Sequence, residues 1–419
     1  MFSSLRAYPM IVLLLPLVAA ILLWDHFFRT ARPEGEQKYG FVIESTPKPT
    51  AKCERFETRT MEGYKVYLYL LRDSTKALPS YGDTVVAKTT VEWSQQVGRA
   101  FAARYLVLPA KTHREPLQKR LYGRLESAGL SGDELATVGA LTLGYKDDLD
   151  PELKRLFQAS GAAHVLAVSG LHTGIIYGLL LWLLTFGGRI RPMHENKWGR
   201  RAISIVIIAA MWGYAWLTGM TPSVVRAVVM VSIFEVGRMV YRQAFSLNTI
   251  AAAAVLILLV RPTDLWSVSF QLSFAATAAI VSLTPAIPLK EGRWPRVVRY
   301  IIGIIVVSLA AQIGTLAITM YYFGQISTYF LLTNLIVLPL ATMLVPCGLI
   351  TIALGGSAVG LLVGKVTYGL AWAMNHAVGW IEGLPGSTIA VHIGPGMVAI
   401  YYLIIISFAV FLLKSKKIA

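Results

Sequence analysis

The residues best suited to chemistry are a serine and two histidines within one run, His164-Val-Leu-Ala-Val-Ser-Gly-Leu-His172. Ser169 and His172 are three positions apart, so on a helix their side chains would be neighbours. A serine beside a basic histidine is the arrangement used for covalent hydrolysis. One hypothesis is therefore an intramembrane serine hydrolase, with His376 as a second histidine supplied by another helix.

Two features of the run argue against that chemistry. Rhomboid-type intramembrane proteases carry Gly-x-Ser-Gly, whereas Ala167 stands two residues before Ser169 here, and neighbours on one helix seldom reach attack geometry. A metal site at His164 and His172 is weaker still, because their span has no carboxylate and no His-Glu-x-x-His motif occurs. We therefore predict no catalytic residue, no metal, no cofactor and no enzymatic activity.

The composition sets the class of protein that must position this run. Hydrophobic residues make up 55% of the chain and charged residues only 15%, against about 25% charged in a soluble domain. This predicts a polytopic α-helical membrane protein. The net charge of +16 suits anionic lipid or nucleic acid, and in a membrane protein it first indicates positive loops on the inside. A disulfide between Cys53 and Cys347 is not expected, because one lies in a polar segment and the other in an apolar run.

The first part of the chain predicts an anchor followed by a β domain. Residues 10–24 are apolar and no small-residue cleavage site follows, so 1–28 reads as an uncleaved N-terminal anchor helix. Within 29–110, runs at 41–43, 64–70 and 84–93 are rich in β-branched and aromatic residues and are separated by turn residues. Short strands of this kind close into small barrels. Aromatic side chains there could stack bases, although a plain aromatic core is the simpler interpretation.

Residues 111–162 predict short amphipathic helices that lead into the membrane. Leu117, Leu121 and Leu125 recur every four residues, which places them on one face of a helix. Ser131 with Glu134 predicts a capping box. Asp150-Pro151 predicts another helix start, with proline at its first position.

Residues 163–419 predict a transmembrane domain of nine spans, which brings the total to about ten with the anchor. The predicted spans are 163–186, 202–219, 222–240, 246–260, 266–288, 300–320, 327–353, 359–383 and 394–413. The short span at 246–260 and the long one at 327–353 leave room for breaks or re-entrant pieces.

The loop charges predict the orientation of these spans. If both termini are cytoplasmic, fifteen lysines and arginines fall on the inner side, and only Arg261 falls in the short outer loops. The positive-inside rule therefore predicts a multi-pass protein of the bacterial cytoplasmic membrane, with both termini inside and residues 29–162 outside.

Arg226 is the most unusual charge within a predicted span. It lies about four residues, or roughly 6 Å, inside the span that begins at 222. It could snorkel to the outer interface, or it could bind phosphate through both arms of its guanidinium. Glu235, nine residues later, lies on another face, and we expect it to pair with a different helix.

Further polar residues recur on successive spans, and we expect them to share a path for an anionic polymer, because no ring of acidic residues accompanies them. Each could instead simply join two helices by hydrogen bonds. The predicted lining residues are His164, Ser169, His172, Ser223, Arg226, Asn248, Gln271, Ser273, Gln312, Thr315 and Asn334.

These motifs carry a family resemblance. The run from His164 to His172 resembles the signature of the ComEC family of competence channels. Ala140-Leu-Thr-Leu-Gly144, Gly219-Met-Thr-Pro-Ser-Val-Val-Arg226 and the polar motifs of the later spans resemble family motifs in their usual order. The resemblance covers residues 40 to 410. It implies an oligonucleotide-binding (OB)-like outer domain and translocation of single-stranded DNA across the cytoplasmic membrane during natural transformation.

The resemblance also implies partners and carries one departure. It implies single-stranded DNA, membrane lipid, DNA-receptor and motor proteins of the competence machinery and possible homo-oligomers as partners. Many family members continue into a C-terminal metallo-β-lactamase-like domain, which we do not find here. If one strand is degraded, we expect another protein to do it. A small-molecule transporter stays open as an alternative, although no convincing inverted repeat supports it.

Overall fold

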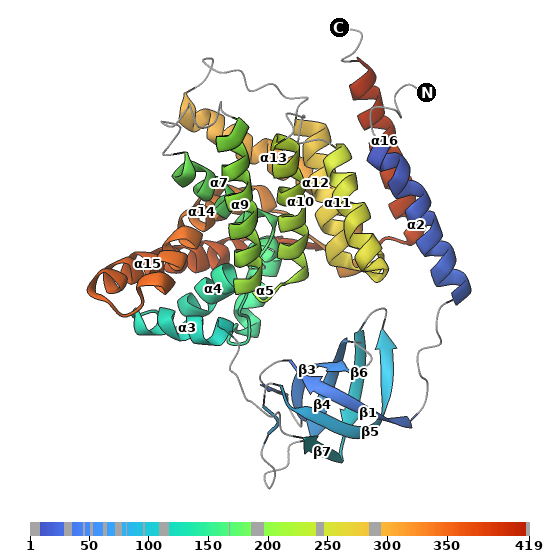
Figure 1. The fold of residues 1–419 in the computed structure, drawn as a ribbon, viewed down its shortest axis with the longest axis vertical. Coiled ribbons are helices and arrows are strands. Elements are labelled where there is room, and N and C mark those ends of the chain that lie inside the picture. The colour runs from blue at the N-terminus through green and yellow to red at the C-terminus, as the bar shows by residue number, and fades with distance from the viewer. Residues whose placement is uncertain are drawn as a thin grey trace. The chain divides into compact units, whose positions relative to one another are not determined.

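Figure 1 shows the fold in a computed structural model of the chain. The structure describes residues 9–28, 36–44, 47–50, 53–61, 65–71, 78–80, 82–94, 97–108, 117–166, 168–185, 197–239, 247–284 and 295–415. The chain divides into two compact units. One comprises Ile21–Arg120, and the other comprises Met1–Ala20 together with Leu121–Ala419.

The smaller unit is a closed five-stranded barrel, which confirms the predicted small barrel. Antiparallel pairing joins β1 to β3, β3 to β4 and β6 to β5, β4 pairs with β6 in parallel, and β5 returns to β1 and closes the ring. Two short strands add to the outside, β2 on β3 and β7 on β5. The strands are β1 (Glu36–Ile43), β2 (Lys48–Pro49), β3 (Cys53–Thr60), β4 (Lys65–Leu71), β5 (Thr84–Ser94), β6 (Val97–Ala102) and β7 (Tyr105–Leu108).

Alternating side chains fill the barrel. Along β3 every second residue is buried, as expected for a strand with one face toward a core. Phe41, Phe56, Leu68 and Leu70 are fully buried inside. The sequence patterns predicted β1, β4 and β5 but missed β3, because Cys53–Thr60 alternates charged residues with the side chains that it buries.

Three short helices follow the barrel in the sequence. They are α3 (Leu117–Ser127), α4 (Gly132–Leu143) and α5 (Pro151–Ala159). Leu125 is buried, as its repeat predicted, and the Asp150 side chain caps α5 by accepting from the Glu152 N–H. The predicted capping box of α4 is wrong, because the side chain of Ser131 makes no capping hydrogen bond. Nearly all of α4 is buried.

Every predicted span is helical over most of its length. The helices are α2 (Pro9–Phe28), α6 (Ala163–Leu166), α7 (Gly170–Leu184), α9 (Lys197–Leu217), α10 (Pro222–Met239), α11 (Leu247–Val260), α12 (Val268–Leu283), α13 (Arg296–Phe323), α14 (Phe330–Leu354), α15 (Ala358–Glu382) and α16 (Pro395–Ser415), with a 3-10 turn η2 (Pro262–Trp266) before α12. Among the described residues, three helices are long and apolar enough to cross a membrane: Trp198–Leu217, Arg296–Phe323 and Phe330–Leu354. The count of ten spans is therefore not confirmed.

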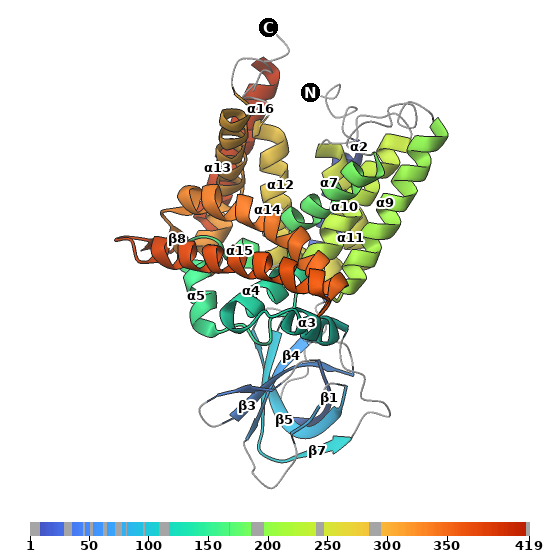
Figure 2. The same cartoon turned by 90° about the vertical axis from the view of Figure 1, so that its left-hand side faces the viewer.

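A break occurs in a span for which none was predicted. The span predicted at 163–186 is broken between α6 and α7, whereas α14 continues through Pro339 and Pro346 without ending. The chain enters α14 from β8 (Gln325–Ser327) and leaves α15 into β9 (Thr388–Ala390), and these two strands pair. Figure 2 shows α14 and α15 running across the direction of α9 and α13.

Most of the charges behind the predicted orientation lie outside the described residues. These are Arg6, Arg189, Arg191, Arg242, Lys290, Arg293, Lys416 and Lys417. Ser246 and Ala167, which belong to two of the sequence motifs, also lie outside them. Cys53 and Cys347 are free, as predicted.

Candidate functional site

The signature run forms a helix start rather than a continuous helix. After α6 ends at Leu166, Ser169 takes an extended conformation (φ −126°, ψ −179°) and α7 begins at Gly170. The backbone N–H of Ser169 donates to Nδ1 of His172 over 3.2 Å, and the Ser169 hydroxyl lies 3.2 Å from the same nitrogen. Adjacency of the two side chains was predicted correctly, but it comes from a helix cap instead of from neighbouring helical turns.

This geometry fixes the tautomer of His172. Because a backbone N–H can only donate, Nδ1 is the acceptor and the ring proton of a neutral imidazole is on Nε2. His172 is fully buried, and its Nε2 has no hydrogen-bond partner among the described residues. His164 instead is exposed, with Nδ1 3.1 Å from the Gly161 carbonyl. The Nδ1 atoms of the two histidines thus have different hydrogen-bond partners, and no cluster of three metal-ligating residues occurs in the described part of the chain.

Three helix starts are joined by hydrogen bonds beside this cap. Ser223, the second residue of α10, donates to the carbonyl of Val168 over 2.8 Å. Arg226, one turn later, donates from one terminal nitrogen to the carbonyl (3.0 Å) and hydroxyl (2.6 Å) of Ser269, the second residue of α12. The first turns of α7, α10 and α12 therefore meet. Since helix N-termini carry partial positive charge, their meeting point favours an anion.

Arg226 sits in this junction rather than at a water interface. It is 2% exposed, so the snorkelling interpretation is wrong for this conformation. Its Nε has no hydrogen-bond partner within the described structure. Asp264 in η2 interacts with it electrostatically; burial raises the pKa of this carboxyl, while Arg261 and Arg226 lower it. A buried arginine with unused donor capacity is suited to bind an anionic group.

The remaining predicted residues make separate local contacts instead of one continuous chain. Gln271 donates from Nε2 to the Leu265 carbonyl over 3.1 Å. Asn248 accepts from the backbone N–H of Met10 over 2.8 Å, so it ties α11 to α2. Asn334 donates to the Ser308 hydroxyl over 3.1 Å and joins α14 to α13.

Among the described residues, no side-chain hydrogen bond joins Ser273, Gln312 or Thr315 to another helix. Thr315 donates to the Ala311 carbonyl of its own helix. Ser273 and Gln312 are half-buried on α12 and α13. Hydrogen bonds thus join the Ser169–His172 cap to Ser223 and join Arg226 to the start of α12, where Gln271 also lies.

Glu235 is the centre of a buried network whose partners the sequence did not reveal. The carboxylate is fully buried and accepts from Tyr177 Oη (2.6 Å), Ser204 Oγ (2.6 Å) and Arg238 (2.7 Å). Arg238 also donates to Tyr177 Oη over 3.1 Å. The network joins α7, α9 and α10, which confirms that Glu235 pairs with other helices. An ionisable residue inside an apolar span was the signal for it.

His376 does not complete a hydrolytic site. Its ring is exposed on α15, where Nδ1 lies 2.9 Å from the Trp372 carbonyl and the imidazole packs on the Trp372 ring at 4.0 Å. Ser169 has its hydrogen-bonding histidine in His172, whose Nδ1 already accepts from a backbone N–H. This arrangement gives the serine no free base.

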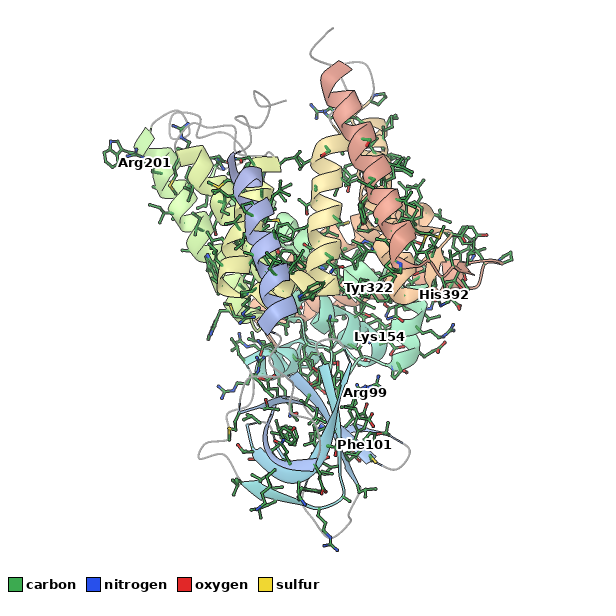
Figure 3. The ribbon with its side chains drawn as sticks, turned by 90° about the vertical axis from the view of Figure 1, so that its right-hand side faces the viewer. Arg99, Phe101, Lys154, Arg201, Tyr322 and His392 are labelled. Atoms are coloured by element: carbon green, nitrogen blue, oxygen red, sulfur yellow. The ribbon has the colours of Figure 1, made fainter. Side chains whose placement is uncertain are left out.

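The barrel carries a second candidate site on the outward side of β3, β4 and β6. The rings of Tyr69 and Phe101 stack at 4.7 Å with an interplanar angle of 18°, and Arg55 lies 5.3 Å from the Tyr67 ring. Arg99 stands beside Tyr67 in the strand register, and Figure 3 shows Arg99 and Phe101 together at the barrel surface. We call Arg55, Tyr67, Tyr69, Arg99 and Phe101 the basic–aromatic face. Phe101 is 59% exposed, so the predicted aromatics are not all core.

Together these features define a helical membrane protein with a small β-barrel and a polar junction of helix starts. A family model described as "Competence protein" matches residues 141–416. The chain belongs to this family, that of the ComEC proteins. The match begins at residue 141, so it does not reach the barrel.

The curated relatives are similar over about half of the chain. The ComE operon protein 3 of Bacillus subtilis is 30% identical over 51% of this chain and 25% of its own length. The competence protein ComA of Neisseria gonorrhoeae is 28% identical over 52% of the chain and 30% of its own length. The uncharacterized protein YcaI of Escherichia coli is 29% identical over 49% and 27%. The matched part thus spans less than a third of each relative, and no solved structure matches.

Proposed function

We propose that this protein translocates single-stranded DNA across the bacterial cytoplasmic membrane during natural transformation. The observation that carries the proposal is the junction of the α7, α10 and α12 starts around the buried Arg226. Partial positive charges of three helices and one guanidinium favour passing phosphates. The junction offers no activated nucleophile, so the protein acts as a channel and not as an enzyme.

The names of the relatives support this assignment. ComA and the matching family model are named for competence, and a role in DNA uptake is what this name suggests for the family. The proposed channel is multi-pass, with both termini cytoplasmic and residues 29–162 outside. Its partners are single-stranded DNA, membrane lipid and the receptor and motor proteins of the competence machinery.

In this proposal, DNA first binds to the barrel. Its strand order, with β4 and β6 parallel and the other main pairs antiparallel, agrees with an OB-fold. The basic–aromatic face lies on β3, β4 and β6, and stacked aromatic rings with arginines suit single strands without sequence preference. Glu57, opposite Tyr67 in the register, reduces the positive charge there, so we expect weak binding.

A deletion strain tests the function. We expect loss of transformation with unchanged uptake of small solutes, and recovery when the gene is restored. A solute-uptake defect with normal transformation would instead assign a transporter, and accumulation of uncleaved membrane proteins would assign a hydrolase.

A further inference from the structure

The helices α14 and α15 form a helical hairpin between the paired strands β8 and β9. We call residues 330–382 the α14–α15 hairpin. Before it, β8 follows α13, and after it β9 leads into α16; Ile326 pairs with Ile389 at the centre of these two strands. The hairpin therefore begins and ends at the same place. Its helices either cross the membrane twice or lie along one surface.

The hairpin contacts the 121–162 segment at both of its ends. At the tip, Arg124 of α3 donates to the Ile352 carbonyl over 3.2 Å. At the base, Arg155 of α5 binds Glu382 at 3.0 Å, and Thr333 donates to the Ser160 carbonyl over 2.6 Å. One polar segment thus follows the hairpin along its length.

Between its two ends, the hairpin contacts α4. Thr137 of α4 donates to Asn375 over 2.9 Å. Gly348 packs so closely on α4 that an added Cβ would lie 2.6 Å from Thr142. The hairpin and α4 therefore form one packed layer, with charged neighbours at both ends.

If the hairpin crossed the membrane, charged residues of the 121–162 segment would have to lie in or beside the hydrocarbon. The 25 residues of α14 span roughly 37 Å, more than the ~30 Å of hydrocarbon. If α14 crossed, Arg124 and Arg155 would lie on opposite sides of the membrane. The loop between α4 and α5, with Lys146, Asp147 and Asp148, would then have to pass through or beside the hydrocarbon, where charges are costly.

The apolar composition of α14 has another explanation. The helix packs against α4, α6, α7, α13 and α15, although Met343, Ile350 and Leu354 stay exposed. A helix that is apolar all round is found either among packed neighbours or across a membrane. Its length and hydropathy therefore do not require a crossing.

The side of α15 that faces away from α4 and α14 has the composition of a surface that contacts a membrane interface. One side is buried on α4 and α14, where Ala371 is fully covered, and Gly364 packs on Ala128 just before α4. The opposite side exposes apolar residues together with Lys365 and His376: Val359 (60%), Leu362 (67%), Val366 (53%), Trp372 (48%) and Trp380 (60%). Tryptophans and a lysine among aliphatic residues are typical of helices at the membrane interface.

We propose that the α14–α15 hairpin lies along the membrane–water interface and that the exposed side of α15 contacts lipid there. Two of the ten predicted crossings are thereby removed, and eight remain with both termini still on one side. If residues 29–162 are outside, the hairpin lies at the outer interface. Only this choice of side rests on the proposed function.

Spin-label depth measurements in proteoliposomes test the proposal. Starting from Cys53→Ser with Cys347→Ser, single cysteines replace Val359, Val366, Trp372 and Trp380 on α15. We expect all four labels at similar depth near the headgroups. A crossing α15 would instead separate the first and last labels by roughly 32 Å along the helix axis, with the deepest label in the middle, and would overturn the proposal. Four labels exposed to water alone would also overturn it.

Exposed positions of α13 provide a matched control. Labels at Val297, Val307 and Tyr321 should give the deepest signal at Val307, which shows that the variant is inserted and folded. In whole cells, Ser357→Cys at the tip and Thr388→Cys at the base should react with an impermeant maleimide from the same side as Ser131→Cys. Reaction of Ser357→Cys from the opposite side would contradict the proposal. Neither measurement uses DNA, so failure here is distinct from failure of the proposed transport.

Discussion

The backbone N–H of Ser169 donates to Nδ1 of His172 over 3.2 Å, which makes this histidine the capping partner of its own helix. Glutamate or glutamine at the third helical position usually plays this part. A general base would have to accept the proton of the Ser169 hydroxyl, and Nδ1 of His172 already accepts the backbone N–H instead. The most reactive pair in the sequence thus stabilises the start of α7.

The first prediction concerns this cap. His172→Gln should keep the cap and leave the thermal stability in detergent close to that of the wild type, whereas His172→Ala should lose about 1 kcal/mol. A fluorophosphonate probe should not label Ser169 in any of these proteins. If the probe labelled the wild type and Ser169→Ala abolished that labelling, the hydrolase hypothesis would be restored.

The second prediction concerns Arg226. Arg226→Lys should accumulate normally and transform poorly, because lysine lacks the planar fork that can hold Ser269 and a phosphate together. Ser269→Ala removes one of the two hydrogen bonds to Arg226 and should have a smaller effect. The assay is transformation frequency divided by the membrane level of the protein. A wild-type frequency for Arg226→Lys would make Arg226 a structural link between α10 and α12.

The third prediction concerns the basic–aromatic face. The isolated 35–110 unit, which has its own core, should bind single strands weakly, with an affinity that falls as salt rises. Replacing both Tyr69 and Phe101 with alanine should cost about 1–3 kcal/mol for each base that no longer stacks.

Leu106 offers the matched control for this face. It is 61% exposed on β7, which pairs with β5 outside the face, and Leu106→Ala should leave the affinity unchanged. Equal losses in the two variants would show that the binding is not at the basic–aromatic face.

The fourth prediction concerns orientation. Ser80→Cys, in the barrel unit, should react with an impermeant maleimide in intact cells. Asn196→Cys, before α9, should react only after permeabilisation, because positive loops stay inside. The reverse pattern would refute the direction of import.

The fifth prediction concerns the Glu235 network. Glu235→Leu should destabilise the protein by about 3–5 kcal/mol, since it leaves Arg238 without its buried partner. Glu235→Leu with Arg238→Leu should recover part of that loss, because no unpaired charge remains. The measurement is the unfolding midpoint in detergent. An equally large loss in the double variant would mean that packing, and not charge pairing, holds α7, α9 and α10 together.

Short-range patterns in the sequence were enough to predict the local features of this protein. Apolar runs of helical length predicted each helix from α7 to α16, and the barrel strands rich in β-branched residues were foreseen, because both depend on short-range patterns of side chains. The signature run also pointed to the family, and Glu235 was recognised as a residue that needs a partner on another helix.

Contacts between residues far apart in the sequence became visible only in the folded structure. Ser223 contacts Val168 and Arg226 contacts Ser269 across 55 and 43 residues of sequence, and no pattern within a single helix encodes such pairs. The break before α7 was also missed, because Ser169 and His172 have the same spacing in a helix and in a cap. Length and hydropathy likewise do not separate a crossing helix from one that packs among neighbours, since both can be apolar all round. The proposal for α14 therefore rests on its contacts with Arg124, Ser160 and Thr142.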